Sequence, residues 1–317
     1  MAPMIAVWDD HETANDSWVG GAQNHQGDKE GDWNHRRAAS MQAYREWLPI
    51  SDEPWKAYQI GTLATLYRTE TRHLARTQQP NLTDVFKEAN VDAALATYRD
   101  GVWQNPDATL LGSTQEYWLD RSFHSGARAG AWQIVGSGTI LGRTVMPKNA
   151  ADWLKPGTNR KTVTSFRNYI QAAKHDLPMW TDRWDGYPAA RERLLRSAQS
   201  ANADLVMLTG DSHNAWAYGL EQDEKPAGVE FSTHSITSGG EEAFYAADSA
   251  TVARGYVDAN AELKWANIQY RGYTMLEITP QKVTGEWLFL DTVHRPSAEL
   301  AGTHRMHVMR GRKVFGS

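Results

Sequence analysis

The pattern of apolar and polar residues along this chain predicts short strands and longer helices in alternation. Three apolar runs of strand length end at a polar or glycine-rich break, as buried strands do. They are Met4 to Trp8, "AWQIVGSG" and "ADLVMLTG". The polar stretch from Thr13 to Asp32 holds four glycines and predicts a long loop after the first run.

Helical spacing occurs in segments that also carry the expected end signals. "WNHRRAASMQAYREWLP" ends at a proline, and the stretch from Asp84 to Tyr98 fits a second helix. "STQEYWLDRSF" opens with Ser113 and has Glu116 three residues later, which is the spacing of a capping box. "YPAARERLLRSAQS" has a proline in its first turn, where proline favours the start of a helix.

From Val229 onward the pattern changes to strand-rich runs such as "EFSTHSIT", "YTMLEIT", "VTGEWLFL" and "RMHVMR". The chain contains no repeat, no low-complexity tract and no clear linker. Alternating helices and strands without a boundary predict the α/β fold class and a single domain over residues 1–317.

Composition narrows the classes of partner. The 317 residues are 41% apolar, and the net charge of −5 is spread along the chain, so no nucleic-acid groove is indicated. The chain has no cysteine, which excludes disulfides, thiolate metal ligands and a thiol nucleophile. The N-terminal apolar run is shorter than a signal-peptide core, and no run is long enough to span a bilayer, so we expect no membrane partner.

Two segments share one design, in which an apolar run is followed by a sharp polar break, an acid and a histidine. The first, "IAVWDDHETAN", contains Asp9, Asp10 and His11, and the second, "VMLTGDSHNAW", contains Asp211 and His213. The carboxyl ends of parallel strands converge on one crevice, so we expect these side chains to meet there. Gathered carboxylates and imidazoles repel or compete unless a cation joins them, and they therefore predict a metal site. Taken singly, each segment is also typical of a surface turn.

Three further residues could supply oxygen ligands to such a metal. Asp182 and Asp185 lie just before the helix that Pro188 begins, where an aspartate is typical of a helix cap and is also able to reach a metal. Asn15 lies in a loop rich in Gly and Asp, where asparagine is typical of a turn and its carbonyl oxygen suits a hard cation.

An ordered series of motifs resembles the PhoD-like alkaline phosphatases, a branch of the metallophosphoesterases. It runs from about Ile5 to about Val314 and comprises "WDDHE", "AND", "ETRHLARTQ", "LLGSTQEYWL", "WQIVGSG", "DRWDGYPAARERLL", "LTGDSHNAW" and "EFSTHSITS". The resemblance implies a calcineurin-like four-layer sandwich, in which two mixed β-sheets are flanked by helices. It also implies a calcium and iron centre, release of phosphate from monoesters or diesters, and export to the periplasm or the cell exterior.

The resemblance assigns roles only where the motifs match. The implied metal ligands are Asp10, Asn15, Asp185, Asp211 and His213, with Asp9 close by. It implies that the His11 imidazole lies near the scissile phosphate, where it would donate a proton to the leaving oxygen. Arg72, in the "ETR" match, would hold a phosphate oxygen through its planar fork, although it is equally typical of a surface arginine.

The chain departs from the family in front of "WDDHE". Family members carry a long segment there, with a Gly-Asp pair, a tyrosine and a cysteine that hold the iron, and this chain starts without it. We therefore expect a domain truncated at its N-terminus, with Ca²⁺ favoured and Fe³⁺, Zn²⁺ or Mn²⁺ as alternatives. The same gap leaves no leader from which to read a compartment.

Two hypotheses of different classes follow. The first is a metal-dependent phosphoesterase, in which a metal-bound hydroxide attacks a small-molecule phosphate ester. The second is a catalytically silent fold that binds metal or phosphate and pairs with another chain, for example as a homo-oligomer, through sheet edges left uncovered. A non-specific nuclease is a third interpretation, which the absence of a basic groove disfavours.

Overall fold

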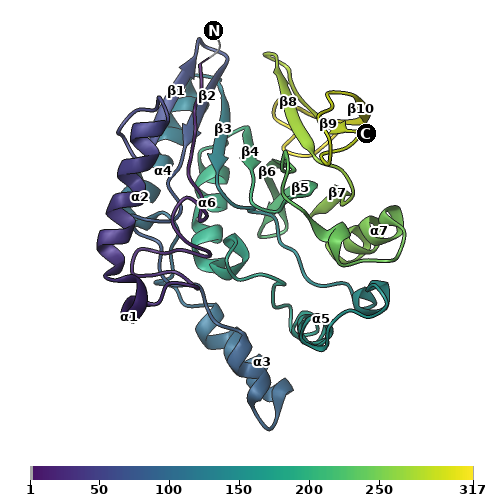
Figure 1. The fold of residues 1–317 in the computed structure, drawn as a ribbon. Helices are drawn as coiled ribbons and strands as arrows, with labels where there is room; N and C mark the ends of the chain where they lie inside the picture. The colour runs from purple at the N-terminus through teal and green to yellow at the C-terminus, as the bar shows by residue number, and fades with distance from the viewer. Residues whose placement is uncertain (1–2, 317) are drawn as a thin grey trace.

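A computed structural model describes residues 3–316 as a mixed α/β protein with two β-sheets (Figure 1). The larger sheet has seven strands in the order β1-β2-β3-β4-β6-β5-β7. Their bounds are β1 (Lys56–Ile60), β2 (Ala64–Arg68), β3 (Trp132–Ser137), β4 (Leu205–Thr209), β5 (Ala215–Gln222), β6 (Lys225–Ser232) and β7 (Leu263–Asn267). Strands β2, β3, β4 and β6 are parallel, whereas β1, β5 and β7 run antiparallel to their neighbours.

The smaller sheet is antiparallel, in the order β10-β9-β8, and comes entirely from the C-terminal part of the chain. Its strands are β8 (Gly272–Ile278), β9 (Lys282–Leu290) and β10 (Leu300–Met309). The helices are α1 (Gly27–Glu30), α2 (Trp33–Trp47), α3 (Val91–Tyr98), α4 (Gly112–Arg128), α5 (Arg160–Ala173), α6 (Pro188–Ser200) and α7 (Ser249–Ala259). Short 3₁₀ or π turns are η1 (Thr83–Lys87), η2 (Arg99–Trp103), η3 (Ala150–Trp153), η4 (Trp184–Gly186) and η5 (Glu241–Ala243).

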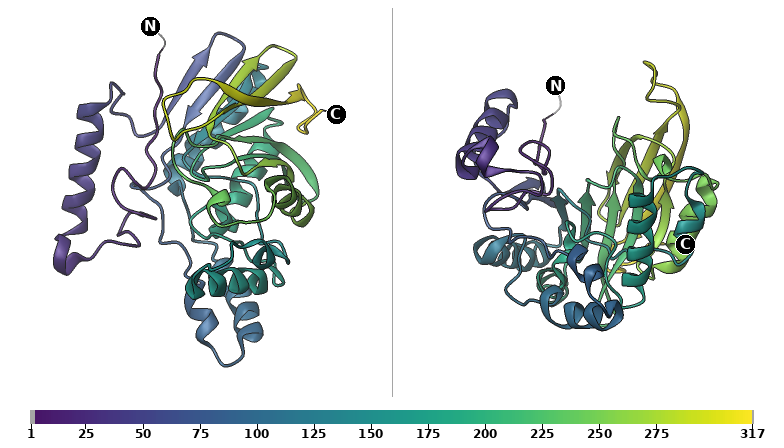
Figure 2. Two further views of the ribbon diagram at one scale, coloured as in Figure 1. Left: turned by 45° about the vertical axis from the view of Figure 1, so that its right-hand side comes forward. Right: turned by 60° about the horizontal axis from the view of Figure 1, so that its bottom comes forward.

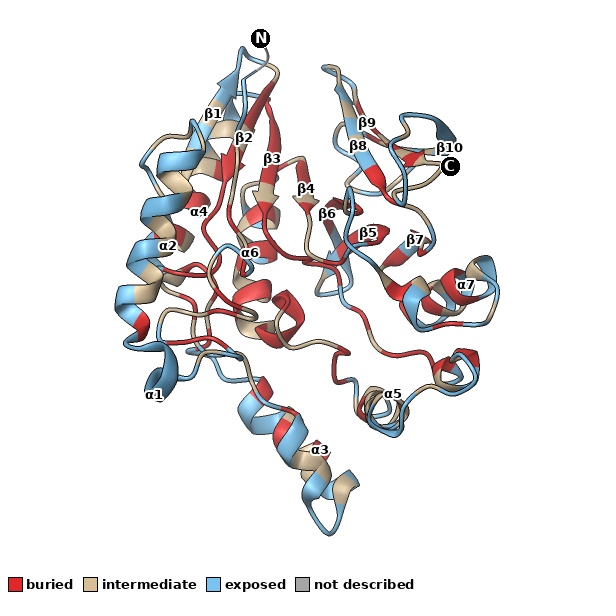
Figure 3. Ribbon diagram, viewed as in Figure 1, coloured by how far each residue is buried: buried red, intermediate tan, exposed pale blue. Residues whose placement is uncertain are grey.

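Each face of the larger sheet is buried by a different layer. On one face, Phe123 of α4, Leu195 of α6 and Tyr256 of α7 pack with the strands in one apolar core. On the other face, Trp287 and Phe289 of β9 pack in a second core against the same strands. Figure 3 shows β3 and β4 as largely buried. The central strands are therefore buried on both sides, which explains why "ADLVMLTG" reads as a continuous apolar run.

The described layers are thus helices, the larger sheet and the smaller sheet. Strand β8 alternates between inward residues and exposed ones such as Tyr273 and Met275 on the outer face of the smaller sheet. Figure 2 shows α2 beside the N-terminal segment at one side of the molecule, and α3 projecting away from the sheets. Among residues 3–316, no helix combines the length and apolarity that a membrane span requires.

Most of the predicted elements are confirmed. Helices α2, α4 and α6 and strands β3 and β4 lie where periodicity places them, and the C-terminal part is strand-rich. The predicted capping box is wrong, because α4 begins at Gly112 and Glu116 instead binds Thr109 and Arg193. The stretch from Asp84 to Tyr98 divides into η1 and α3 rather than forming one helix.

The predicted strand at Met4 to Trp8 is also wrong. This segment pairs with no strand in the described structure, and Met4 and Ile5 are 62% and 40% exposed. Only Trp8 is buried, and its Nε1–H donates to Glu70 Oε1 at 2.8 Å. Trp8 therefore anchors the acidic loop that follows it.

Candidate metal centre

The candidate site lies at the carboxyl ends of the parallel strands, where loops from separate strands meet. The loop after β2 carries Arg72, the loop after β3 begins with Gly138, and the loop after β4 carries Asp211. The N-terminal acidic loop reaches the same edge, because a Cβ built on Gly138 would lie 2.8 Å from Asp9 Oδ1. Asp9 and Asp211 are close enough for Asp211 to raise the pKa of Asp9, so the two acid-histidine segments lie at the same edge, although only the second follows a strand.

Three carboxylates form the tightest group. Asp10, Asp16 and Asp182 each offer an oxygen, and these oxygens all lie within 4.8 Å of one another. The backbone carbonyl of Asp10 accepts the N–H of Thr13 and of Ala14, which turns the chain back toward the sheet. Asp10 Oδ2 then accepts the Asp16 N–H at 2.9 Å. Asp16 has a φ of 50°, a left-handed conformation that aspartate tolerates better than most residues.

The electrostatics of this group favour a bound cation. Burial, together with Asp182 and Asp10, raises the pKa of Asp16 to about 7. Burial also raises the pKa of Asp9, to which Asp211 and Asp10 add, while Arg72 opposes it. Five carboxylates in this neighbourhood, those of Asp9, Asp10, Asp16, Asp182 and Asp211, face three guanidinium groups, those of Arg72, Arg76 and Arg183.

The remaining excess of negative charge, together with an all-oxygen donor set, fits a hard divalent cation such as Ca²⁺, Mg²⁺ or Mn²⁺. Three acidic oxygens that converge this closely are expensive without a positive partner. The residues present therefore fit the kind of metal centre that the sequence predicts.

Arg72 lies behind the carboxylates. Its Nε donates to Asp9 Oδ1 at 2.7 Å and its Nη1 to Asp182 Oδ1 at 2.8 Å. The side chain is fully buried and does not line the neighbouring cavity. Its loop is fixed by Glu70, whose Oε1 accepts the backbone N–H of Arg72 at 2.8 Å and of His73 at 2.7 Å. Arg72 therefore neutralises the charge of Asp9 and Asp182 and is not exposed to a ligand in the cavity.

Asp211 and His213 adopt left-handed backbone conformations, with φ of 68° and 60°, in the loop after β4. Strain of this kind is concentrated at functional sites. Asp211 Oδ2 accepts a hydrogen bond from Thr139 Oγ1 at 3.1 Å. His213 Nδ1 lies 2.7 Å from the Gly239 carbonyl, which can only accept, so the proton is on Nδ1 and the Nε2 lone pair is free for a metal. Both residues lie outside the tight three-carboxylate group.

The other expected residues of the acidic loop lie around the group. His11 has a 76% exposed side chain, and its Nε2 is 3.8 Å from Asp10 Oδ2. Asn15 donates from Nδ2 to Gln23 Oε1 at 2.6 Å, which holds the loop closed and leaves Oδ1 as an acceptor.

The structure does not bring Asp185 to this group. The short η4 turn directs its side chain into the core, where Oδ2 accepts the Thr144 N–H at 2.8 Å. Its carbonyl accepts from Trp103 Nε1 at 2.6 Å, and burial raises the pKa of its carboxyl to about 6. The acid that this segment contributes is Asp182, three residues earlier.

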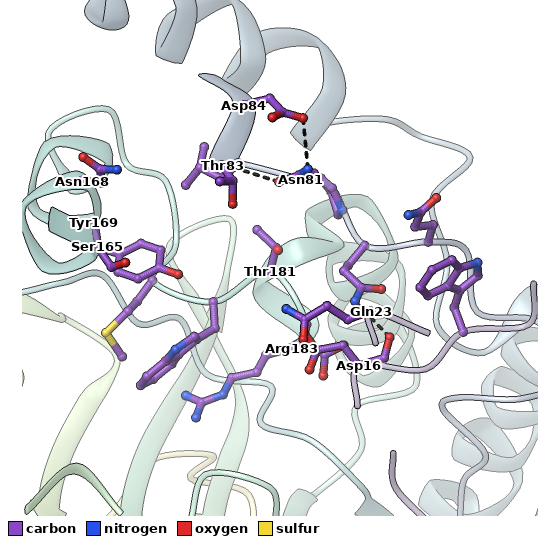
Figure 4. A pocket seen from close by; sticks show the side chains of 18 of the residues that line it. Asp16, Gln23, Asn81, Thr83, Asp84, Ser165, Asn168, Tyr169, Thr181 and Arg183 are labelled. Atoms are coloured by element: carbon purple, nitrogen blue, oxygen red, sulfur yellow. Dashed lines mark hydrogen bonds between the residues drawn. The ribbon is translucent and has the colours of Figure 1, made fainter. Parts of the chain in front are cut away.

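A cavity of about 680 Å³ opens beside the carboxylates. Asp16, Asp182, Arg183 and Asp211 line its charged end. Figure 4 shows Asp16 and Gln23 on one side, residues of α5 such as Tyr169 and Asn168 on the other, and the segment of Asn81 and Thr83 between them. The cavity is large enough for an organic ester with its phosphoryl group at the acidic end.

Sequence reasoning missed Asp16 and Arg183, and it wrongly chose Asp185 rather than Asp182 as the metal ligand of this segment. Asp16 directly follows Asn15 in the same polar loop, so its residue type and position were the available signal. Nothing in the spacing of "TDRWDG" shows which aspartate faces the loop edge, because the η4 turn decides it.

Together the fold and the site define an α/β protein with a carboxylate-rich centre at the carboxyl ends of its parallel strands. Residues 1–287 match the family model of the PhoD-like phosphatases, and the chain belongs to this family.

Known members show the extent of the similarity. The chain is 29% identical over 314 residues to alkaline phosphatase D of Bacillus subtilis (strain 168), covering 94% of this chain and 46% of the relative. It is similar to a solved structure described as the structure of PhoD, with a TM-score of 0.70, 26% identity, and coverage of 98% of this chain and 53% of the other. The chain thus spans about half the length of these relatives.

Proposed function

We propose that this protein is a metal-dependent phosphoesterase that hydrolyses phosphomonoesters, phosphodiesters or both. The observation that carries the proposal is the convergence of Asp10, Asp16 and Asp182 within 4.8 Å in a PhoD-like phosphatase chain. The adjacent cavity, with Arg183 at its acidic end, supplies a place for the ester.

In this proposal Asp10, Asp16 and Asp182 hold the cation, and Asn15, Asp211 and His213 are additional candidate ligands. Calcium is the favoured ion because the closest donors are all carboxylate oxygens, and iron, zinc and manganese remain the alternatives. When bound, such an ion neutralises charge on the phosphoryl oxygens and increases the acidity of water.

The protein's own residues would position the ester and supply a proton. His11 is exposed beside Asp10, so its imidazole is free to donate a proton to the leaving oxygen. Arg72 and Arg76 both donate to Asp182 Oδ1, which holds that carboxylate in place before any ligand arrives. The rest of the cavity wall, which carries polar side chains such as Asn81 and Asn168 and aromatic ones such as Tyr169, would contact the organic part of the ester.

Two aspartates three residues apart provide the test. Asp182→Asn should lower calcium affinity and turnover of a chromogenic phosphomonoester or diester at least about tenfold, because a ligand costs more than an outer-shell partner. Asp185→Asn is the matched control, because an amide oxygen still accepts the Thr144 N–H. This variant should retain the calcium affinity and the turnover of the unmodified protein. Bound metal is quantified by plasma mass spectrometry, and EDTA should remove the turnover.

Equal loss of metal in both variants, or turnover that EDTA leaves unchanged, would contradict the proposal. The unfolding midpoint of each variant, measured in parallel, separates loss of a ligand from loss of the fold.

We propose the four-layer sandwich of the calcineurin-like phosphoesterases as the fold of the family domain. Two sheets packed face to face, with helices outside the larger one, support it. The alternative function is a silent metal- or phosphate-binding chain that associates with a second copy. Strand β1 favours it, because β1 lies at an edge of the larger sheet and Ile60 at its end is exposed. A single monomeric species in ultracentrifugation at high concentration would argue against the oligomer.

A further inference from the structure

The strongest unassigned feature is the side chain of Arg183 at the wall of the cavity (Figure 4). Its guanidinium carbon is 3.9 Å from the centre of the Trp180 ring, and its Nε is 3.5 Å from Asp211 Oδ2. Only 8% of the side chain is exposed. Stacking on Trp180 and the ion pair with Asp211 fix the plane of the guanidinium and hold it at the acidic end of the cavity.

One nitrogen of this guanidinium donates no hydrogen bond within residues 3–316. Its Nη1 is buried and has no hydrogen-bond partner in the part of the chain that the structure describes. Stacking uses the face of the guanidinium and leaves its in-plane N–H groups free. A buried donor without a partner costs free energy, and this one belongs to a side chain that lines the cavity. An oxyanion in the cavity would supply the missing acceptor.

Arg72 Nη2 and Arg76 Nη1 are also buried without a partner among the described residues, so the position of Arg183 at the cavity, and not its spare donor alone, sets it apart. Arg72 is fully buried and donates to Asp9 and Asp182, and Arg76 donates to Asp182 and to the Tyr187 hydroxyl. Neither of them lines the cavity, whereas Arg183 does. A guanidinium fork that reaches the cavity is suited to two oxygens of a tetrahedral anion.

We propose that Arg183 binds the non-bridging oxygens of the phosphoryl group, in both the ester and the phosphate product, while Arg72, which lies behind the carboxylates, balances their charge. The inference rests on the proposed function for the identity of the ester, and on the geometry of the cavity for the binding of the anion.

The test is the affinity of the metal-loaded protein for inorganic phosphate, measured by titration calorimetry. Arg183→Gln should weaken phosphate binding about tenfold to a hundredfold, the range for loss of a hydrogen-bonded charged group. Arg183→Lys keeps the charge but not the fork, and should give an intermediate affinity.

Arg143→Gln is the matched control. Its guanidinium carbon lies 5.7 Å from the centre of the Trp103 ring, outside the cavity lining, so the variant removes a tryptophan-stacked charge elsewhere. It should bind phosphate as the unmodified protein does. Metal content and unfolding midpoint are measured for all variants, and Arg183→Lys keeps the test valid if Arg183→Gln folds poorly.

The outcomes separate the two proposals. Turnover in the unmodified protein with unchanged phosphate affinity in both Arg183 variants would overturn the role of Arg183 and leave the phosphoesterase standing. Phosphate binding that depends on Arg183, in a protein without turnover, would support the anion site and count against the enzyme. Absence of both phosphate binding and turnover in the metal-loaded unmodified protein would overturn both.

Discussion

Glu70 shows how one buried carboxylate organises the loop behind the candidate metal centre. Its two oxygens accept from Trp8 Nε1 and from the backbone N–H groups of Arg72, His73 and Leu74. Hydrogen bonds to an ionised acceptor are stronger than neutral ones, so this loop is fixed before any ligand binds. The same carboxylate joins the N-terminal segment to the loop after β2, which brings Asp9 within reach of Arg72.

His234 gives a pH dependence at the residue scale. Its Nε2–H donates to the Leu288 carbonyl at 3.1 Å, and burial, with Arg271 adding, lowers the pKa of the ring to about 4. The unfolded chain binds the proton near pH 6.5, so the contribution of neutral His234 to stability is complete above that pH and is lost as pH falls toward 4.

We therefore expect the unfolding free energy to fall between pH 7.5 and pH 5 by about 2 kcal/mol more in the unmodified protein than in His234→Gln. Urea unfolding of both proteins at the two pH values measures this difference, and other titrating groups cancel in the comparison. Parallel pH profiles for the two proteins would show that His234 does not carry the effect.

At the scale of elements, the sequence predicts β3, β4, α2, α4 and α6 because burial and amphipathic spacing leave a local pattern. It fails at Met4 to Trp8 because an apolar run does not reveal whether a strand edge is available for pairing. The site residues divide in the same way, into those that a local pattern predicts and those that tertiary structure decides. Asp211 reaches this edge because it follows a parallel strand, whereas Asp10 lies in a loop that Trp8 anchors through Glu70. The choice between Asp182 and Asp185 depends on the η4 turn, which leaves no periodic signal.

Gly138, immediately after β3, tests how closely the acidic loop packs on this strand end. A Cβ there would lie 2.8 Å from Asp9 Oδ1 and 3.3 Å from Thr71 Oγ1. We expect Gly138→Ala to displace Asp9, lower calcium affinity and destabilise the fold by about 1–3 kcal/mol, the usual cost of overpacking. Calcium titration and urea unfolding give the two values.

The control for Gly138→Ala is Gly27→Ala in α1, where an added Cβ meets no atom within 4 Å. It should leave both the free energy of calcium binding and the free energy of unfolding within about 0.5 kcal/mol of the values for the unmodified protein, as surface substitutions do. Normal metal binding by Gly138→Ala would mean that the acidic loop tolerates displacement from the strand end.

For the whole molecule, the proposed cation site makes stability depend on metal. Asp10, Asp16 and Asp182 repel one another when the site is metal-free, and a bound divalent ion removes that cost. A cation that binds only the folded state raises stability by mass action, by about 2.7 kcal/mol at a hundred times its dissociation constant. EDTA should therefore lower the unfolding temperature of the unmodified protein.

Asp16→Asn separates the repulsion among the carboxylates in the metal-free protein from the stability gained when the cation binds. Asparagine has nearly the same shape and tolerates the left-handed φ of 50°, but it removes one of the three negative charges. We expect the metal-free variant to be at least as stable as the metal-free unmodified protein, and to gain much less when calcium is added. Thermal unfolding with EDTA and with increasing calcium measures both quantities, with Asp28→Asn on exposed α1 as the control. A variant that loses stability without metal and still responds fully to calcium would place the cation elsewhere, and would remove the charge argument on which this centre depends.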